Sequence, residues 1–150
     1  MARLTSYDEG NQEIIIKKEE SKYRNNTHKT FVEECCAKAK NSDVYHKALF
    51  YTLGLTEDCQ RNINDLYDWS DRCVKPLDGL SWITGTDMRI IRLAYNLFNN
   101  GAPTAFELCG EEKESELEKY TPTSIFSYLS PELREYCFEA IRIRFEMTAC

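Results

Sequence analysis

A row of polar side chains near the middle of the chain has the residue types and the spacing to bind an anion. Arg89, Arg92 and Asn96 follow one another at steps of three and four residues, so they share one face if this stretch is a helix. The row begins beside Thr84-Gly85-Thr86, where free backbone N–H groups and the positive end of the helix dipole would lie. A phosphate or a carboxylate suits such a position. We therefore predict a small anionic, nucleotide-like ligand bound by six residues: Thr84, Thr86, Arg89, Arg92, Asn96 and Trp82.

A purely structural interpretation of this row stays open. Asp87 falls in the first turn of the same predicted helix and could itself use the helix dipole. The arginines could instead face water or pair with aspartates of the preceding segment. These aspartates are Asp65, Asp68 and Asp71. Trp82 lies in the long connection 70–85, and a connection of that length is often functional because it can close over a site.

Thiols and imidazoles, the other groups able to do chemistry, are not spaced for it. Among seven cysteines and two histidines, no two cysteines have the short separation that is usual in structural zinc sites. Three cysteines fall on apolar stripes and are predicted to be small core residues: Cys35, Cys59 and Cys137. His46 is predicted to face solvent beside Lys47. We therefore predict no metal, no cofactor and no catalytic residue, and whether the chain has any enzymatic activity stays open.

The charge of the chain is negative and unevenly distributed. Its net charge is −6, and residues 107–150 alone contain ten acidic and five basic residues. An acidic surface disfavours nucleic acid, which needs clustered lysine and arginine, but it permits a basic protein partner. No apolar run is long enough to span a membrane, and the N-terminus lacks the apolar region of a signal peptide. We therefore expect a cytoplasmic protein with reduced thiols.

Helical periodicity dominates the elements that would position these side chains. Apolar residues recur at helical spacing, with capping residues before them, and predict the longest helices near residues 42–53, 56–69, 86–99 and 131–145. Thr86 is the expected N-cap of the third, and Gly54 the expected stop of the first. Ile91, Tyr95 and Ile141 should share one core. The long loop between the middle two helices does not fit a helix-turn-helix. These patterns predict an all-α single domain of five or six helices over residues 28–150.

Residues 1–27 are predicted to form an arm outside this domain. They mix charges and contain one apolar triplet, Ile14-Ile15-Ile16, which could form a short strand. The arm is expected to be flexible or to dock on the body or on a neighbouring copy, so a homo-oligomer through the arm is one possibility.

Several segments, in one order along the chain, resemble a known group of proteins. They read VYHKALFYTLGL, RNINDLYDW, KP…GLSWITGT, RIIRLAYNLFN, EKYTP and YCFEAIRIRF. Over residues 30–145 the chain resembles a small family of uncharacterised proteins from low-GC Gram-positive bacteria and their prophages. The resemblance implies a cytoplasmic accessory protein of phages or mobile elements. It implies no activity, cofactor or catalytic residue.

Three functions follow from these expectations. The leading one is a non-enzymatic counter-defence factor that binds a host protein through its acidic C-terminal half and exposed aromatic residues. The second is sequestration of a small anionic ligand at the predicted arginine site. The third is hydrolysis of such a nucleotide-like molecule.

Overall fold

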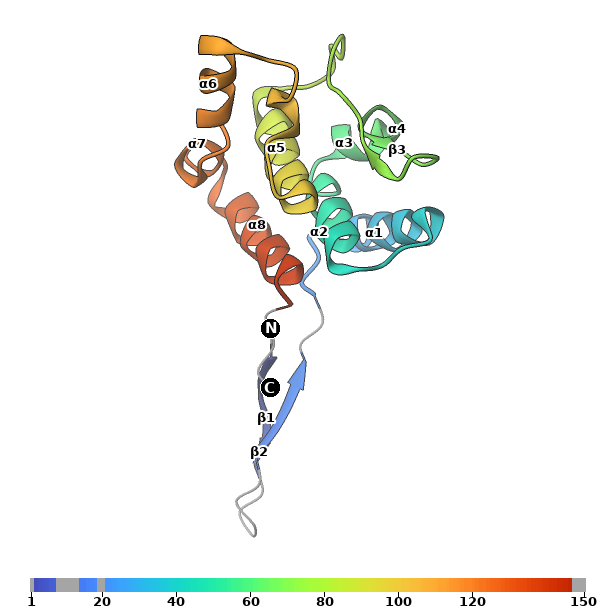
Figure 1. Cartoon of the computed structure of the whole chain (residues 1–150). Helices are drawn as coiled ribbons and strands as arrows, with labels where there is room; N and C mark the ends of the chain where they lie inside the picture. The colour runs from blue at the N-terminus through green and yellow to red at the C-terminus, as the bar shows by residue number, and fades with distance from the viewer. Residues whose placement is uncertain (1, 8–13, 19–20, 147–150) are drawn as a thin grey trace.

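Two helices, α2 (Val44–Leu53) and α5 (Gly85–Asn99), pack along each other at the centre of the helical domain (Figure 1). The computed structural model describes residues 2–7, 14–18 and 21–146. Both α1 (Asn26–Ala39) and α8 (Pro131–Arg144) lie against α2, and α7 (Pro122–Phe126) lies against α5. The shorter elements are α3 (Glu57–Arg61), α4 (Ile63–Leu66), β3 (Tyr67–Asp68), β4 (Cys73–Val74), the 3-10 helix η1 (Pro103–Ala105) and α6 (Gly110–Glu118). The described residues form eight α-helices, so the all-α single domain is confirmed, with more helices than predicted.

The predicted helix 56–69 is wrong in its second half. Helix α3 stops at Asn62, whose side chain donates a hydrogen bond to the Asp58 carbonyl (2.8 Å) and whose backbone leaves helical geometry at ψ 28°. One more turn, α4, follows, and then Tyr67 and Asp68 pair antiparallel with Val74 and Cys73. An asparagine side chain that hydrogen-bonds a nearby backbone carbonyl competes with the hydrogen bonds of the helix. A pattern of apolar residues alone does not reveal this competition.

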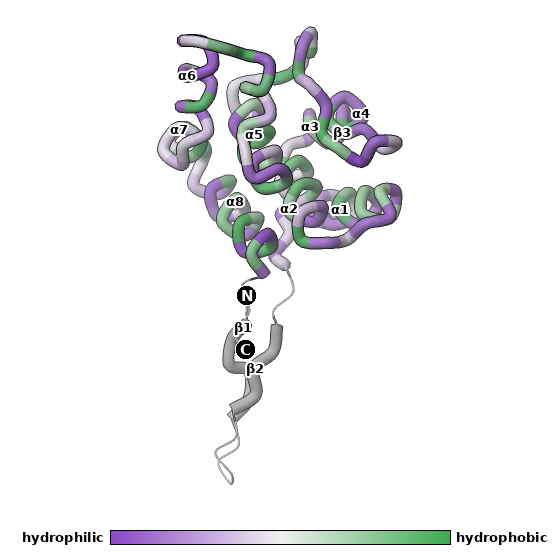
Figure 2. The backbone as a smooth tube through the Cα atoms, in the orientation of Figure 1, coloured by the Kyte–Doolittle hydropathy of each residue, from purple (hydrophilic) through white to green (hydrophobic). Residues whose placement is uncertain are grey.

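The core lies between α2 and its three neighbours, α1, α5 and α8. Every residue from Ala48 to Leu53 is buried, as the sequence predicted for a helix covered on most sides, and Figure 2 shows hydrophobic residues recurring along these helices. Ile91 and Tyr95 are also fully buried. Ile141 is only partly buried, because α8 turns Leu133, Cys137 and Ala140 toward α2 instead. The prediction is thus right for Ile91 and Tyr95, and Ile141 packs against the same core from its edge.

The N-terminal strands β1 (Ala2–Tyr7) and β2 (Ile14–Lys18) form an antiparallel hairpin that projects from the helical domain (Figure 1). The isoleucine triplet therefore lies in a strand, which was one of the possibilities that the sequence left open. The chain joins the domain before the predicted boundary at residue 27, since Asn25 already caps α1 by accepting a hydrogen bond from the His28 N–H (2.8 Å).

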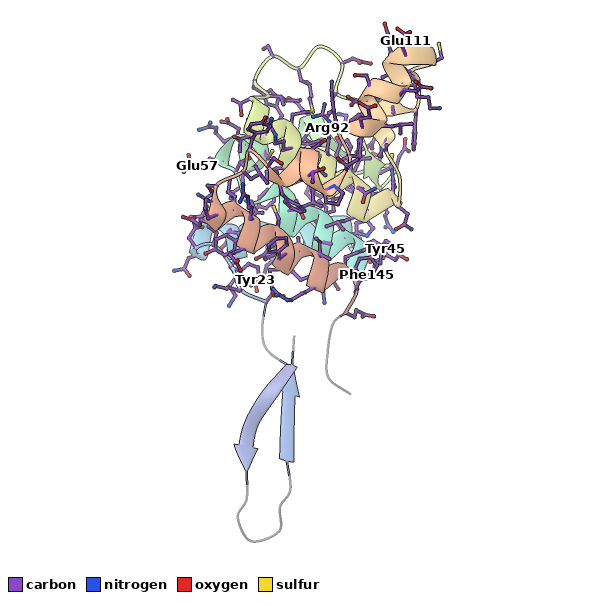
Figure 3. All side chains as sticks on the ribbon, turned by 90° about the vertical axis from the view of Figure 1, so that its left-hand side faces the viewer. Tyr23, Tyr45, Glu57, Arg92, Glu111 and Phe145 are labelled. Atoms are coloured by element: carbon purple, nitrogen blue, oxygen red, sulfur yellow. The ribbon has the colours of Figure 1, made fainter. Side chains whose placement is uncertain are left out.

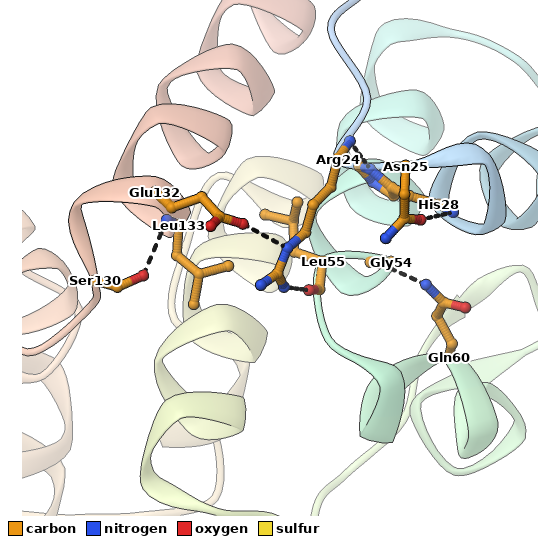
Figure 4. A network of polar contacts seen from close by, with 9 residues as sticks. All are labelled: Arg24, Asn25, His28, Gly54, Leu55, Gln60, Ser130, Glu132 and Leu133. Atoms are coloured by element: carbon orange, nitrogen blue, oxygen red, sulfur yellow. Dashed lines mark hydrogen bonds and ion pairs between the residues drawn. The ribbon is translucent and has the colours of Figure 1, made fainter.

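A polar network fastens this entry segment to the domain (Figure 4). The Arg24 guanidinium donates to the Leu55 carbonyl (2.6 Å) and to the Glu132 carboxylate on α8 (2.9 Å). His28 is fully buried beneath it; its Nδ1 accepts from the Arg24 N–H (3.0 Å) and its Nε2 lies 2.8 Å from the Tyr51 carbonyl. These two partners fix the neutral tautomer with the proton on Nε2. Burial lowers the pKa of His28 from its usual 6.5, although its bond to the Tyr51 carbonyl acts in the opposite direction.

Because of this histidine, the protein is expected to become less stable as the pH is lowered below about 6.5. Above pH 6.5 the imidazole is neutral in both folded and unfolded chains, so it contributes no pH dependence. Below pH 6.5 the imidazole becomes protonated in the unfolded chain but stays neutral in the folded protein. The free energy of unfolding therefore decreases by up to about 1.4 kcal/mol per pH unit until the lowered pKa of the folded protein is reached. Thermal unfolding between about pH 7.5 and pH 5 should show this slope, and His28→Gln should flatten it. An equal slope in the variant would assign the effect to other groups.

Candidate functional site

The N-terminus of α5 is occupied by the chain's own carboxylate. Thr84, not the predicted Thr86, is the N-cap, because its hydroxyl accepts from the Asp87 N–H (3.2 Å) while the Asp87 carboxylate accepts from the Thr84 N–H (3.1 Å). Asp87 is 2% exposed, so this capping box is largely shielded from solvent. The helix dipole and the free N–H groups that would have favoured a bound anion therefore already act on Asp87.

Arg92 forms an ion pair with a residue from a distant part of the chain. Its guanidinium lies 3.2 Å from the Glu116 carboxylate of α6, and both side chains are only 13% exposed. The same carboxylate accepts from the Thr104 hydroxyl (2.6 Å), which lies 2.6 Å from the Tyr120 hydroxyl. Burial raises the pKa of Tyr120 and keeps its phenol neutral. This cluster ties α6 and η1 to the central helix, and it replaces the aspartate partners that the structural interpretation had offered.

Among the described residues, the Arg92 Nε is a buried nitrogen without a hydrogen-bond partner. The sequence did not point to Glu116, Thr104 or Tyr120 as its neighbours. The glutamate-rich tract here is helix α6, of which Glu116 is the inward-facing member. The three-to-four-residue spacing of Arg92 and Asn96 was a signal for one face of a helix, but it held no information on what covers that face.

The other predicted site residues do not converge on one cavity. Arg89 donates to the Gly85 carbonyl of its own helix (3.1 Å) and stacks on the Tyr128 ring (4.9 Å). Asn96 donates to the Gly101 carbonyl (2.8 Å) beyond the end of α5, and the Trp82 indole donates to Asp65 (3.0 Å). Thr86 is exposed on the first turn of α5. These residues stay a predicted anion site, but the structure gives most of their polar groups partners within the protein.

A different surface is formed by α6, α7 and α8, which follow one another down one side of the helical domain (Figure 1), the side that faces the viewer in Figure 3. We call it the α6–α8 face. Its most exposed apolar residues are Tyr128 at 77%, Phe145 at 62%, Leu117 at 44% and Phe138 at 40%. A hollow of about 210 Å³ opens between α5, α7 and α8, with walls that include Leu93, Leu97, Ile125, Phe126, Ile141 and Phe145. Side chains of this size exposed together on a soluble domain are typical of a binding surface.

Phe145 is held at the end of this face by a stacked cation. The Arg144 guanidinium lies 3.9 Å from the Tyr45 ring and 5.0 Å from the Phe145 ring. It also donates to the Leu97 carbonyl (2.8 Å) and to the Asn100 side chain (2.8 Å) at the end of α5. Arg144 therefore holds Phe145 in place, although the Phe145 ring is exposed. Figure 3 shows Phe145 at the opposite end of this side of the molecule from Glu111.

Helix α6 gives the same face a negative border. Its sequence, GEEKESELE, has five glutamates and one lysine, and no residue of the helix is buried. Glu111 and Glu112 lie in its first turn, where the helix dipole favours acidic side chains. The face therefore combines a largely apolar hollow between α5, α7 and α8 with an acidic helix, α6, at its other end.

A larger cavity lies elsewhere, beside α1, α2 and the end of α8. It has a volume of about 510 Å³ and is lined in part by Tyr23, Val32, Cys36, Lys40, Lys47 and Ile143. Burial raises the pKa of the Cys36 thiol, which leaves it protonated and a poor nucleophile. The cavity therefore has the size of a ligand pocket but no activated group for chemistry.

Burial also governs the remaining thiols and His46. Cys35, Cys59 and Cys137 are buried, as predicted, and burial raises the pKa of each to about 12. The prediction for His46 is wrong: it is 6% exposed and lies between the Asp43 carboxylate (3.0 Å) and the Tyr67 hydroxyl (3.1 Å). The expected polar face of α2 is covered by Tyr67, which comes from the strand that follows α4.

Two further findings concern the described residues alone. In them, no three or more histidine, cysteine, aspartate or glutamate side chains lie together as metal ligands would. None of the helices in this part of the chain has the length and apolar character needed to cross a membrane.

Comparisons with known proteins identify a family and no closer relative. No protein with a curated description and no solved structure matches the chain. One family pattern, described as a family of unknown function, matches residues 18–149 and so covers the whole helical domain and the end of the second strand. The chain belongs to this family of unknown function, DUF6075.

Proposed function

We propose that this protein acts by binding another protein, without catalysis, and that it does so through the α6–α8 face. The exposed aromatic side chains of α8 and its surroundings, of which Phe145 lines the apolar hollow, are the observation that supports this most directly. Phe145, Phe138 and Tyr128 leave 62%, 40% and 77% of their surfaces in water. Aromatic residues of this kind dominate binding energy when a partner covers them, because each buries a large area with little loss of conformational freedom.

The charge of α6, at the other end of this face from Phe145, defines the chemistry of the partner. Helix α6 has a net charge of −4 from five glutamates and one lysine, so a partner with lysine or arginine beside an apolar segment is complementary to it. An apolar side chain of that partner would enter the 210 Å³ hollow, while its cations would face α6. An acidic or uniformly polar partner fits neither part of this face.

The proposed biological setting comes from the resemblance in sequence. A resemblance to proteins from low-GC Gram-positive bacteria and their prophages suits a cytoplasmic counter-defence factor that inhibits a host protein by covering part of it. The anion-binding alternative is less well supported, because Arg92 is paired with Glu116 and Asp87 already uses the α5 N-terminus.

An affinity measurement with matched variants tests the proposal. The protein is used to capture partners from a bacterial host lysate, and each captured protein is then purified and titrated against variants. Phe145→Ala should weaken binding by roughly tenfold or more, as expected for an exposed aromatic residue that a partner covers on binding. The triple change of Glu111, Glu112 and Glu114 to glutamine should slow association and reduce its dependence on salt.

The control changes two glutamates outside this face, Glu34 on α1 and Glu57 on α3, to glutamine; both are exposed. The control should bind as the unchanged protein does. Binding that survives both Phe145→Ala and the triple variant, or that weakens equally in the control, would reject the α6–α8 face. Product formation from a nucleotide panel would reject a non-enzymatic role.

A further inference from the structure

The cavity beside α1, α2 and the end of α8, which we call the α1–α2 cavity, is lined by residues that the structure describes. Its volume of about 510 Å³ lies in the range of sites for small organic molecules, about 300–1,000 Å³. It shares no lining residue with the hollow of the α6–α8 face, and none of the six predicted anion-site residues lines it. A molecule bound here would therefore not occupy the surface proposed for a protein partner.

The two helices that form most of the wall are apolar toward one end of the cavity and cationic toward the other. On α1, Val32, Cys36 and Lys40 follow at steps of four residues and so share one face. On α2, Lys47 and Tyr51 are also four residues apart. Because only residues 40–43 connect α1 to α2, Lys40 and Lys47 both lie near this connection, and Val32 and Tyr51 lie farther from it. The cavity thus has a lysine end and an apolar end.

The apolar end is built from aromatic and aliphatic side chains of three segments. The Tyr23 and Tyr51 rings lie with their centroids 5.7 Å apart, and the Tyr51 hydroxyl donates to the Lys22 carbonyl. Val32 and Tyr51 are buried, whereas Tyr23 and Ile143 are only partly covered. Partly covered carbon surface within a cavity favours an apolar group, because that group removes more of the surface from water.

The lysine end has two cations whose charges are not used within the described part of the chain. Neither the Lys40 nor the Lys47 ammonium forms a hydrogen bond or an ion pair there, and both side chains are exposed. The carbonyls of Ala37 and Cys36 at the end of α1 already accept from the Lys40 and Asn41 N–H groups (3.1 and 3.2 Å). The negative end of this helix is therefore partly neutralised, and the two ammonium groups can face an anion.

The nearby carboxylates do not cancel these cations. Asp43 already accepts from the His46 N–H (2.8 Å) and lies 3.0 Å from the His46 ring nitrogen Nδ1. Burial raises the pKa of the Cys36 thiol; of the two charges that act on it, Lys47 lowers this pKa by more than Asp43 raises it. Glu33, the remaining acidic residue of the wall, lies about two turns before the end of α1. The lysine end is therefore complementary to a negative group.

We propose that the α1–α2 cavity binds an amphipathic carboxylate, a small molecule with one negative head group and an apolar body. The carboxylate lies between the ammonium groups of Lys40 and Lys47, and the apolar body extends along Val32 toward the Tyr23 ring. Charge selects the head group, since the protein has a net charge of −6 and attracts anions only where cations gather. The body supplies affinity by leaving water. A nucleotide-like ligand, polar along its length, would not use the apolar end.

Titration calorimetry with octanoate and the full chain tests this proposal. Octanoate should bind, whereas acetate, which has only the head group, and octanol, which has only the body, should bind at least about tenfold more weakly. The double variant Lys40→Gln/Lys47→Gln nearly keeps the side-chain size and removes both charges. It should weaken octanoate binding by roughly tenfold and leave octanol binding unchanged. Ala37→Phe, at an exposed position of the wall, places a ring in the cavity and should weaken both.

The matched control is Arg72→Gln/Lys113→Gln, which removes two positive charges at exposed positions outside the cavity and should bind octanoate as the unchanged protein does. Alkylation by N-ethylmaleimide, followed by mass spectrometry, locates the ligand. Octanoate should slow the reaction of Cys36, which lines the cavity, and not that of the exposed Cys73 and Cys109.

Four results would each overturn the proposal: no binding of octanoate at millimolar concentration, equal binding of octanol, equal loss of octanoate binding in the control, or protection of Cys73 or Cys109 in place of Cys36. Unchanged octanoate binding by Lys40→Gln/Lys47→Gln would equally reject the lysine end. Because both lysines are exposed, this double variant should keep the helical spectrum of the unchanged protein, so a loss of binding reports on charge and not on folding.

Discussion

Replacing Glu116 with alanine is expected to lower the free energy of unfolding by about 3 kcal/mol, because the change leaves the largely buried charge of Arg92 without its partner. The Thr104 hydroxyl loses its acceptor at the same time. For a chain of this length such a loss should lower the melting temperature by roughly 6–12 °C. Chemical denaturation followed by circular dichroism measures the free energy directly.

Two further variants isolate the ion pair. Glu114→Ala removes an exposed glutamate from the same helix and should change stability by no more than about 0.5 kcal/mol. The double variant Arg92→Leu/Glu116→Leu removes both charges and should recover much of the loss, since no unpaired charge stays buried. If Glu116→Ala is no less stable than Glu114→Ala, the Arg92 guanidinium must be free in solution, and the predicted anion site regains its strongest residue.

The arginine row illustrates what a single sequence can and cannot provide. The spacing of Arg89, Arg92 and Asn96 correctly placed them on one side of one helix. It could not identify the partner, because Glu116 is 24 residues away from Arg92 and is one of five glutamates in its helix. A polar row within an apolar helix therefore has two explanations, a ligand or a distant counter-ion, and only the tertiary structure distinguishes them.

The predictions that depended only on neighbouring residues in the sequence were the most reliable. Ser130 and Pro131 begin α8 as predicted, because a serine cap followed by proline depends only on the residues beside it. The cysteines on apolar stripes are buried as predicted, because the spacing of apolar residues along a helix is also a local signal. His46 was misplaced because its environment is set by Tyr67, and the turn that delivers Tyr67 begins at the break in helix geometry at Asn62. The wrong predictions therefore concern residues whose environment is set by long-range contacts, more than residues whose local sequence pattern is weak.

The link between stability and the proposed function lies in α6. Glu116 fastens this helix to α5, while the exposed glutamates on its other sides supply the charge of the α6–α8 face. Loss of the Arg92–Glu116 pair should therefore weaken partner binding as well, although neither residue needs to touch the partner. The exposed-residue variants Phe145→Ala and the Glu111, Glu112 and Glu114 triple, which leave that pair intact, separate a direct contact from this indirect effect.

Gly54→Ala is expected to destabilise the protein by about 2 kcal/mol through overpacking. Gly54 was predicted to end α2 through its conformational freedom, yet its φ of −70° and ψ of −6° are open to any residue. The glycine is needed for space instead: an added methyl group would lie 2.7 Å from His28 Cδ2, 2.8 Å from Phe31 Cδ1 and 3.0 Å from the Phe50 carbonyl oxygen. His28 cannot move aside without losing its bonds to Arg24 and Tyr51.

The sign of the change makes this a sharp test, because alanine at a glycine with an unstrained backbone otherwise stabilises a protein by about 0.4–1 kcal/mol. Gly85→Ala is the matched control. Its added methyl group would approach only the end of the flexible Arg89 side chain (3.3 Å), so this variant should be as stable as the unchanged protein or slightly more so. Urea denaturation of both variants gives the comparison. If Gly54→Ala proves equal to or more stable than Gly85→Ala, then His28 and Phe31 yield easily, and the packing between α1 and the end of α2 is looser than these distances indicate.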